Sequence, residues 1–261
     1  MKTAIVYNKN IEKTNLVLND LKNSFDKSGI EYDAIDLDDL KPGYDFVCAI
    51  GGDGTILKTS RFYSKTATPV MGINLGRLGF LSLISPKETD KIGEIIKTKD
   101  YNLRERMMLS SLDHTALNDI VIKGHSSART SKFDLYINDK LVSDYIADGI
   151  IVSTPTGSTA YGLSAGGPIL HPGLDAMVVV PICAHTMTAR PLVIPGKEKV
   201  RITGEDETLD IIFDGQTTIK QLKEVNIERS ENRAKLVFPN NYKFYSVLRN
   251  KLYWGISPIS D

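Results

Sequence analysis

Short apolar runs alternate with helical patterns along the first hundred residues. The runs that predict buried strands are 3–7 (TAIVY), 32–35, 46–50 (FVCAI) and 70–73 (VMGI). Apolar residues four apart at Val17, Leu21 and Phe25 predict a helix between the first two strands, and residues 87–97 repeat this pattern. Strands separated by helices are typical of parallel crossover units. The pattern therefore predicts an α/β domain with a Rossmann-like parallel sheet over residues 1–100.

From about residue 101 the pattern changes to strands of alternating polarity. Residues 132–137, the turn Asn138-Asp139 and residues 141–142 predict a β-hairpin. Further strands are predicted at 149–153, 177–182, 192–194, 200–202, 209–213, 225–227 and 234–237. We therefore expect a mainly β domain over residues 101–238. A terminal arm over about 239–261 mixes apolar and basic residues, and the pattern allows it to pack back on the first domain or on the second.

The charge balance and the absence of long apolar segments limit the classes of partner. The 261 residues hold 32 Lys+Arg against 32 Asp+Glu, with no basic run, which argues against nucleic acid or an anionic membrane as partner. The most apolar stretch, 177–184, falls far short of the roughly 20 residues that cross a bilayer. The N-terminus lacks a signal-peptide core, and Cys48 and Cys183 lack disulfide or metal-binding spacing. We expect a cytoplasmic protein without a metal held by cysteine thiolates.

Two glycine-rich loops follow successive predicted strands. Gly51-Gly52-Asp53-Gly54-Thr55 lies between the run 46–50 and a helical segment, which is a phosphate-binding context because glycine amides and a helix start attract anions. It is not a Walker A loop, and a plain Asp-Gly turn is the alternative interpretation. The loop NLGRLGFL at 74–81 follows the next strand. Loops after neighbouring parallel strands emerge at one sheet edge, where ligands bind. Two such loops favour a binding site.

A third segment, DGIIVSTPTGSTAYGLSAGGP at 148–168, is rich in hydroxyl groups. It holds six Ser or Thr between positions 153 and 164, which is more than the cap of one predicted helix near Ser158 requires. Together with Tyr161 they predict a surface for a ligand that carries hydroxyl and phosphate groups.

These three segments and Asn118-Asp119, in this order, closely resemble the bacterial NAD kinases, and the resemblance runs from Phe46 to about Gln216. GGDGT also occurs in lipid kinases, whereas STPTGSTAY is far more specific. The resemblance implies a diacylglycerol-kinase-like first domain and an NAD-binding second domain. It implies magnesium-dependent transfer of a phosphoryl group from ATP to the 2′-hydroxyl of the NAD adenosine ribose, giving NADP, with magnesium carried by ATP. Another GGDGT-superfamily kinase, acting on a lipid or sugar, and a catalytically inactive NAD-binding protein are the alternatives.

The same resemblance implies roles for individual residues. Asp53 would accept the proton of the 2′-hydroxyl, and Gly54 would contact phosphate. Asn118 and Asp119 would bind the adenine and ribose, although the family has glutamate where this chain has Asp119. The other implied nucleotide-binding residues are Lys58, Phe80, Arg129, Asp148, Thr156, Thr159, Ala160, Tyr161, Ser164 and Gln216.

The chain departs from the family pattern at two places. Residues 108–118 are shorter than the corresponding family segment, which predicts a trimmed hairpin, and Ala184 stands where the family often has proline. Family members are commonly homodimers or homotetramers, and the resemblance implies such an assembly here. In the family these loops of the β domain meet across subunits, so a shorter hairpin bears on the geometry of the assembly. None of the four histidines has metal-ligand or catalytic spacing, so each is expected to be structural.

Overall fold

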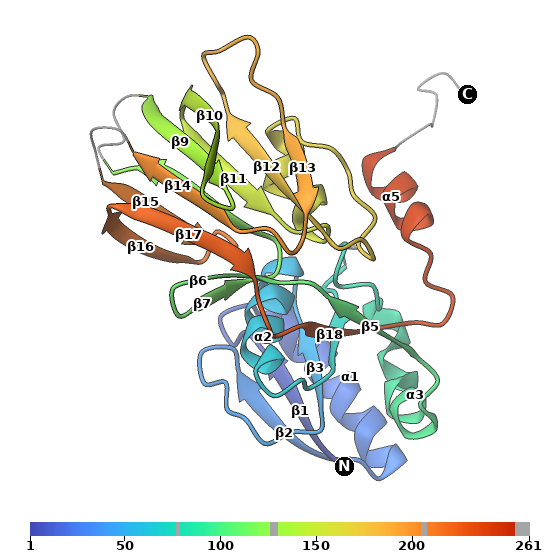
Figure 1. Ribbon diagram of the computed structural model, residues 1–261. Helices are drawn as coiled ribbons and strands as arrows, with labels where there is room; N and C mark the ends of the chain where they lie inside the picture. Colours follow the sequence, from blue (N-terminus) through green and yellow to red (C-terminus); the bar gives the residue numbers. More distant parts are fainter. Residues whose placement is uncertain (77–78, 126–129, 205–207, 254–261) are drawn as a thin grey trace. The chain divides into compact units, whose positions relative to one another are not determined.

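The computed structural model describes residues 1–76, 79–125, 130–204 and 208–253 (Figure 1). The chain divides into two compact units. The first contains Met1–Glu105 and the segment from Ala234 onward, and the second contains Arg106–Arg233. Within the described ranges, no helix combines the length and the apolar character that crossing a membrane requires.

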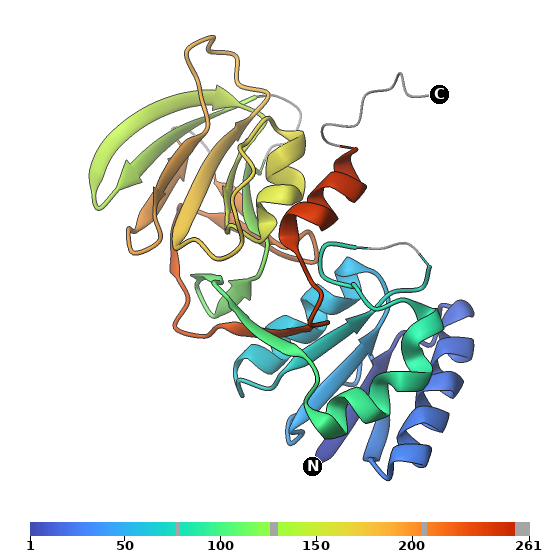
Figure 2. The same ribbon diagram turned by 90° about the vertical axis from the view of Figure 1, so that its right-hand side faces the viewer.

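The first unit is built around a six-stranded sheet. Its strand order is β2 (Glu31–Asp36), β1 (Lys2–Tyr7), β3 (Phe46–Ile50), β4 (Val70–Ile73), β18 (Ala234–Phe238) and β5 (Asn102–Arg106). The first five strands pair in parallel. Helices α1 (Lys13–Ser28) and α3 (Ile92–Thr98) cover one face and α2 (Asp53–Ser64) covers the other (Figures 1 and 2). This burial on both faces explains the continuous apolar runs of the strands, and the predicted α/β fold is confirmed.

The second predicted helix of this unit, 87–97, is divided in two. A 3₁₀ helix, η1 (Pro86–Lys91), precedes α3, and it begins with a capping box in which Ser85 and Glu88 exchange hydrogen bonds. At Gly93 an added Cβ would lie 2.5 Å from the carbonyl oxygen of Ser24, so α3 packs directly on the backbone of α1. The apolar spacing predicted the helical character, and Pro86 stands at the start of η1, where its missing N–H leaves no intrahelical hydrogen bond unmade.

Strand β18 and the terminal arm complete the first unit. Residues 234–237 were expected in the mainly β domain, yet β18 pairs in parallel with β4 and buries Leu236 and Val237. The chain then forms α5 (Phe244–Leu252), which buries Val247 and Leu248. An interior strand of a sheet covered on both faces is largely apolar, and a short run such as AKLVF cannot be distinguished by pattern from a sandwich strand.

The second unit is a sandwich of two antiparallel sheets. One has the order β10 (Lys140–Ala147), β9 (Ser131–Ile137), β14 (Val200–Gly204), β17 (Glu224–Arg229), β6 (Leu109–Ser111) and β7 (His114–Ala116). The other has the order β13 (Leu192–Pro195), β12 (Ala176–Ile182), β11 (Gly149–Ser153), β8 (Asp119–Gly124), β15 (Leu209–Phe213) and β16 (Thr217–Leu222). Apolar side chains of both sheets, such as fully buried Leu135 and Ile150, form one core. The predicted mainly β fold is confirmed.

Local turns in this unit follow from particular residues. Asn138 and Asp139 both have positive φ, 49° and 63°, which is the geometry of a tight hairpin turn, so the predicted turn between β9 and β10 is confirmed. Strands β6 and β7 form a short hairpin within the segment 108–118. The helix expected near Ser158 is instead a 3₁₀ turn, η2 (Gly157–Thr159), followed by one helical turn, α4 (Tyr161–Ser164).

Candidate functional site

The first candidate cluster lies in the first unit and centres on Asp53. This residue opens α2, directly after the exposed Gly52. Its carboxylate accepts hydrogen bonds from the amides of Phe80 at 2.9 Å, Leu81 at 3.2 Å and Ser82 at 3.2 Å, and from the hydroxyl of Ser82 at 3.1 Å. Four donors from the second glycine loop therefore hold one side chain of the first loop in place.

Two glycines make this approach possible. At Gly79 an added Cβ would lie 2.5 Å from the Ser82 hydroxyl oxygen and closer still to Asp53 Oδ1. At Gly51 an added Cβ would lie 2.6 Å from the Cβ of Thr55, in the first turn of α2. Both positions follow strands of the parallel sheet, so the predicted convergence of the two loops at one edge is observed. A helix start in such a setting attracts phosphate groups.

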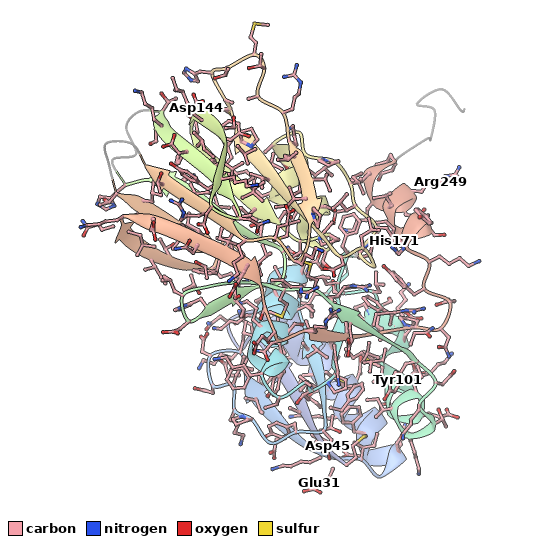
Figure 3. The ribbon with its side chains drawn as sticks, in the orientation of Figure 1. Glu31, Asp45, Tyr101, Asp144, His171 and Arg249 are labelled. Atoms are coloured by element: carbon pink, nitrogen blue, oxygen red, sulfur yellow. The ribbon has the colours of Figure 1, made fainter. Side chains whose placement is uncertain are left out.

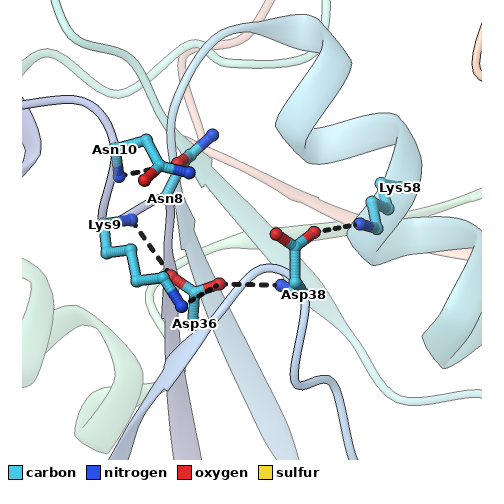
Figure 4. A network of polar contacts seen from close by, with 6 residues as sticks. All are labelled: Asn8, Lys9, Asn10, Asp36, Asp38 and Lys58. Carbon is cyan, nitrogen blue, oxygen red and sulfur yellow. Dashed lines mark hydrogen bonds and ion pairs between the residues drawn. The ribbon is translucent and has the colours of Figure 1, made fainter.

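Lys58, another predicted binding residue, lies further along α2 and already has a partner. Its Nζ is 2.7 Å from Oδ1 of Asp38, in the loop after β2 (Figure 4). Asp36, at the end of β2, accepts hydrogen bonds from the amides of Asp38 at 3.0 Å and Lys9 at 3.1 Å. These bonds, the Asp38 amide first, lower the pKa of Asp36 and keep it ionised. Lys58 therefore belongs to a network at the ends of β1 and β2.

The second candidate cluster lies in the second unit, around Asn118 and Asp119 at the start of β8. A cavity of about 300 Å³ is lined by Asn118, Asp119, Val121, Lys123, Ala160, Tyr161, Ile212, Asp214 and Gly215. Asp119 is only 4% exposed. Among the described residues, no group donates a hydrogen bond to its carboxylate. Burial, and then the charge of Asp214, raise the pKa of Asp119 to about 7.

The hydroxyl-rich segment packs against the backbone of this cluster. At Gly157 an added Cβ would lie 2.5 Å from the Cα of Asn118 and closer still to its carbonyl group. The hydroxyl of Ser158 accepts from the amide of Leu170 at 2.9 Å and donates to the carbonyl of Pro155 at 2.7 Å. Some hydroxyls of this segment therefore stabilise the fold of the loop.

The structure brings only part of the predicted set to the cavity. Ala160 and Tyr161 line it together with Asn118 and Asp119. Thr156 and Thr159 belong to the adjoining loop, where the Thr159 hydroxyl donates to the Thr156 carbonyl at 3.4 Å. Ser164 and Gln216 are exposed, at the end of α4 and after β15. Asp148 precedes β11, whose five residues span about 16 Å, so it lies at the opposite end of that strand from Ser153. Arg129 lies outside the described residues.

Two charged residues that line this cavity were not predicted as site residues. Lys123 lines the cavity from β8, and Asp214 lines it from the turn after β15. Asp214 has a positive φ of 49° and precedes Gly215. An aspartate-glycine pair after an apolar strand is an ordinary turn signal. Nothing in the sequence distinguishes it from a turn without function.

The remaining candidate groups have structural surroundings. The ring of His171 accepts a hydrogen bond from the amide of Gly173 at 3.1 Å (Figure 3), and the ring of His125 lies 2.9 Å from Asp210. Burial raises the pKa of Cys48, whereas Cys183 is exposed. In the part of the chain that the structure describes, no three His, Cys, Asp or Glu side chains gather as a metal site would require.

The fold and the two clusters define a two-domain nucleotide-binding protein. Residues 12–101 match the model of the ATP-NAD kinase N-terminal domain, and residues 117–238 match that of the ATP-NAD kinase C-terminal domain. An NAD kinase of Legionella pneumophila is 43% identical over 226 residues, which cover 81% of this chain and 76% of that protein. One from Hydrogenovibrio crunogenus is 39% identical, over 88% and 83% of the two chains. A crystal structure of an NAD kinase from Archaeoglobus fulgidus in complex with ATP superposes with a TM-score of 0.83, at 28% identity over 97% and 99%. The chain belongs to the NAD kinase family.

Proposed function

We propose that this protein transfers the γ-phosphoryl group of ATP to the 2′-hydroxyl of the adenosine ribose of NAD, giving NADP. The proposed acceptor is held in the second unit, and the residues that act on its hydroxyl and on the donor phosphates are those around Asp53. The relatives named above support this proposal, because both of the family's domains are present, at residues 12–101 and 117–238.

The buried carboxylate of Asp119 is the observation that carries the acceptor half of the proposal. A carboxylate on a residue that is only 4% exposed, and that receives no hydrogen bond within the described chain, is costly unless a ligand supplies donors. The two hydroxyls of a ribose are such donors. The amide of neighbouring Asn118 both donates and accepts, as recognition of an adenine edge requires. The cavity is large enough for part of a nucleotide, not for the whole of NAD.

Asp53 is the proposed catalytic residue. Phosphoryl transfer passes through a loose transition state with little bond formation to the nucleophile, so orientation of the hydroxyl contributes more than early removal of its proton. A carboxylate fixed by four hydrogen bonds is well suited to this, because its position is set before the substrate binds. Oδ2 accepts only one of these four hydrogen bonds, and it is the atom proposed to accept the hydroxyl proton late in the reaction.

Gly54 and the first amides of α2 are the proposed contacts of the donor phosphates. Magnesium carried by ATP would supply positive charge against the negative charge that develops on the phosphates, and no residue of this chain is proposed to hold it. Asp53 is the carboxylate at this helix start, and its oxygens already accept four hydrogen bonds. This arrangement fits a metal ion that would be held mainly by phosphate oxygens.

The test is to incubate the purified protein with NAD, ATP and magnesium and to measure NADP with an NADP-specific dehydrogenase. Accumulation of NADP that depends on both substrates is expected. Parallel reactions with polyphosphate as donor, and with NADH, diacylglycerol or a sugar as acceptor, define the substrate range. Phosphorylation of a lipid or sugar in place of NAD would support the alternative kinase. NAD binding without NADP from any donor would support the inactive NAD-binding protein, and either result would refute the proposal.

We also propose that the protein assembles as a homodimer or homotetramer and acts in the cytoplasm. The resemblance to the family supports the assembly, and the two cysteines without disulfide spacing support the location. Light scattering during size-exclusion chromatography measures the first, and cell fractionation with an antibody tests the second. A monomer at micromolar concentration would refute the assembly.

A further inference from the structure

The backbone of Asn118 and Asp119 is held from one side by Asp214. Oδ1 of Asp214 accepts hydrogen bonds from the amides of Asn118 at 2.7 Å and Asp119 at 3.1 Å, and Oδ2 accepts from the amide of Leu117 at 3.0 Å. The amide of Asp214 in turn donates to the carbonyl of Asp119 at 2.9 Å. One residue of the β15–β16 turn therefore fixes three consecutive peptide groups.

Thr154 holds the same segment from β11. Its hydroxyl donates to the carbonyl of Leu117 at 2.6 Å and accepts from the amide of Gly157 at 3.0 Å. Its amide donates to the carbonyl of Asn118 at 2.9 Å. Thr154 is fully buried, so these bonds form away from water. The amides of Leu117, Asn118 and Asp119 thus donate to Asp214, whereas the carbonyls of Leu117 and Asn118 accept from Thr154.

We propose that Asp214 and Thr154 are positioning residues that fix the backbone of Asn118 and Asp119 for nucleotide binding. This inference rests on the proposed function, since it concerns the NAD half of the reaction. Asp214 also has an electrostatic effect, because it is an anion beside the buried carboxylate of Asp119. Its charge opposes ionisation of Asp119, while its hydrogen bonds hold the same backbone in place.

The ionisation of Asp119 distinguishes positioning from a general structural role. Burial first, and Asp214 second, raise the pKa of Asp119 to about 7. The other titratable groups that line the cavity are Lys123 on β8 and Tyr161 on α4. Ionised Asp119 accepts hydrogen bonds from ribose hydroxyls more strongly than the protonated carboxyl group does. The KM for NAD is therefore expected to rise as the pH falls through about 7.

The decisive variant is Asp214→Asn. Asparagine tolerates the φ of 49° at this position, so the turn is preserved. Its oxygen can replace Oδ1, but its NH₂ group then faces the amide of Leu117, donor against donor. We expect the KM for NAD to rise about tenfold, which corresponds to about 1.4 kcal/mol, with kcat and the KM for ATP within about twofold. Because the negative charge is lost, the midpoint of the pH profile is expected to move to lower pH.

Asp210→Asn is the matched control. Asp210 lies on β15, the strand that Asp214 follows. Its carboxylate accepts a hydrogen bond from the amide of Gln221 at 3.1 Å and lies 2.9 Å from the ring of His125, but Asp210 does not line the cavity. We expect this variant to keep the wild-type KM and pH profile. A higher KM in Asp214→Asn without movement of its midpoint would show a merely structural role and would overturn the proposal. An unchanged KM would overturn it too.

A Thr154 pair keeps the inference testable if Asp214→Asn does not fold. Thr154→Val removes both bonds of the hydroxyl at nearly constant volume, and Thr154→Ser retains them. We expect the valine variant to weaken NAD binding, measured by calorimetry, and the serine variant to restore it. Equal affinity of the valine variant and the wild type would refute the role of Thr154. Wild-type protein that binds NAD but forms no NADP would instead refute the proposed function, and calorimetry would still test the positioning residues.

Discussion

Gly157 offers a prediction whose size can be worked out from the structure. In Gly157→Ala the new Cβ would lie 2.5 Å from the Cα of Asn118 and closer still to its carbonyl group. Carbon atoms in contact are normally about 3.5–4.0 Å apart, so the two backbone segments must separate by roughly 1 Å. Both are backbone, and no side-chain rotation relieves the overlap.

The separation would weaken three hydrogen bonds. These are the bonds from the Thr154 amide at 2.9 Å and the Ser153 hydroxyl at 3.2 Å to the Asn118 carbonyl, and that from the Gly157 amide to the Thr154 hydroxyl at 3.0 Å. At about 1 kcal/mol each, Gly157→Ala is expected to lower the free energy of unfolding by about 3 kcal/mol. The KM for NAD is expected to rise as well, because the displaced group belongs to Asn118.

Gly162→Ala is the matched control in the same segment. The nearest atom to its added Cβ is the Cβ of Ser153 at 3.8 Å, an ordinary contact, and the residue is helical. Alanine there is expected to leave stability unchanged or to raise it by about 0.5–1 kcal/mol. Urea unfolding followed by circular dichroism measures both variants. Equal midpoints for Gly157→Ala and Gly162→Ala would refute the reasoning.

Three further predictions concern single side chains. Asp53→Asn is expected to lower kcat by about 10²–10⁴-fold. Ser82→Ala removes one hydrogen bond to the same carboxylate and is expected to cost about 1 kcal/mol of stability while keeping most of the rate. Steady-state kinetics compare the two variants, and equal activity would contradict this assignment. Asp119→Asn is expected to gain stability over wild type as the pH rises from 4 to 8, by up to about 4 kcal/mol. In the wild type, the folded pKa of Asp119, about 7, exceeds the unfolded value of about 3.9. The stabilisation that protonated Asp119 provides is therefore lost as the pH rises through this range. Urea titrations at several pH values measure the difference between the variant and the wild type. Exposed Cys183 is expected to react with a thiol reagent in the folded protein, and Cys48 only after unfolding, as mass spectrometry of labelled peptides would show.

The apolar patterns predicted elements well where one physical requirement dominated. The run FVCAI became β3 with the predicted bounds, because each of its side chains is buried between two helical layers. Strand β8 was not predicted, although it lies in the middle of its sheet, because its sequence DIVIKG begins with the polar residue of the site motif. Strand β18 was predicted as a strand, but its sheet depends on pairing with residues more than 160 positions away. Pairing partners over such distances leave no mark in a local pattern.

The candidate site divides in the same way. Glycine and hydroxyl motifs indicated Asp53, the second glycine loop and the segment after β11, and the structure brings the two glycine loops together at Asp53. Asp214 could not be predicted, because its role depends on accepting three amides that lie 95 to 97 residues away. Lys58 looked available from the sequence, but its ion pair with Asp38 needs the end of β2 to lie beside α2.

The two central carboxylates differ in a way that assigns them different tasks. Asp53 has four donors around it before any ligand arrives, so its position is fixed and it gains little from binding. Asp119 is more deeply buried and, within the described residues, has no donor, so its ionised form is costly until hydroxyl groups enter the cavity. In the proposed site, ligand binding relieves this cost at Asp119, and we expect part of the affinity for a ribose to come from that relief. A protein with zero net charge can in this way bind an anionic dinucleotide, because the affinity at this cavity depends on unsatisfied hydrogen bonds and needs no positive field.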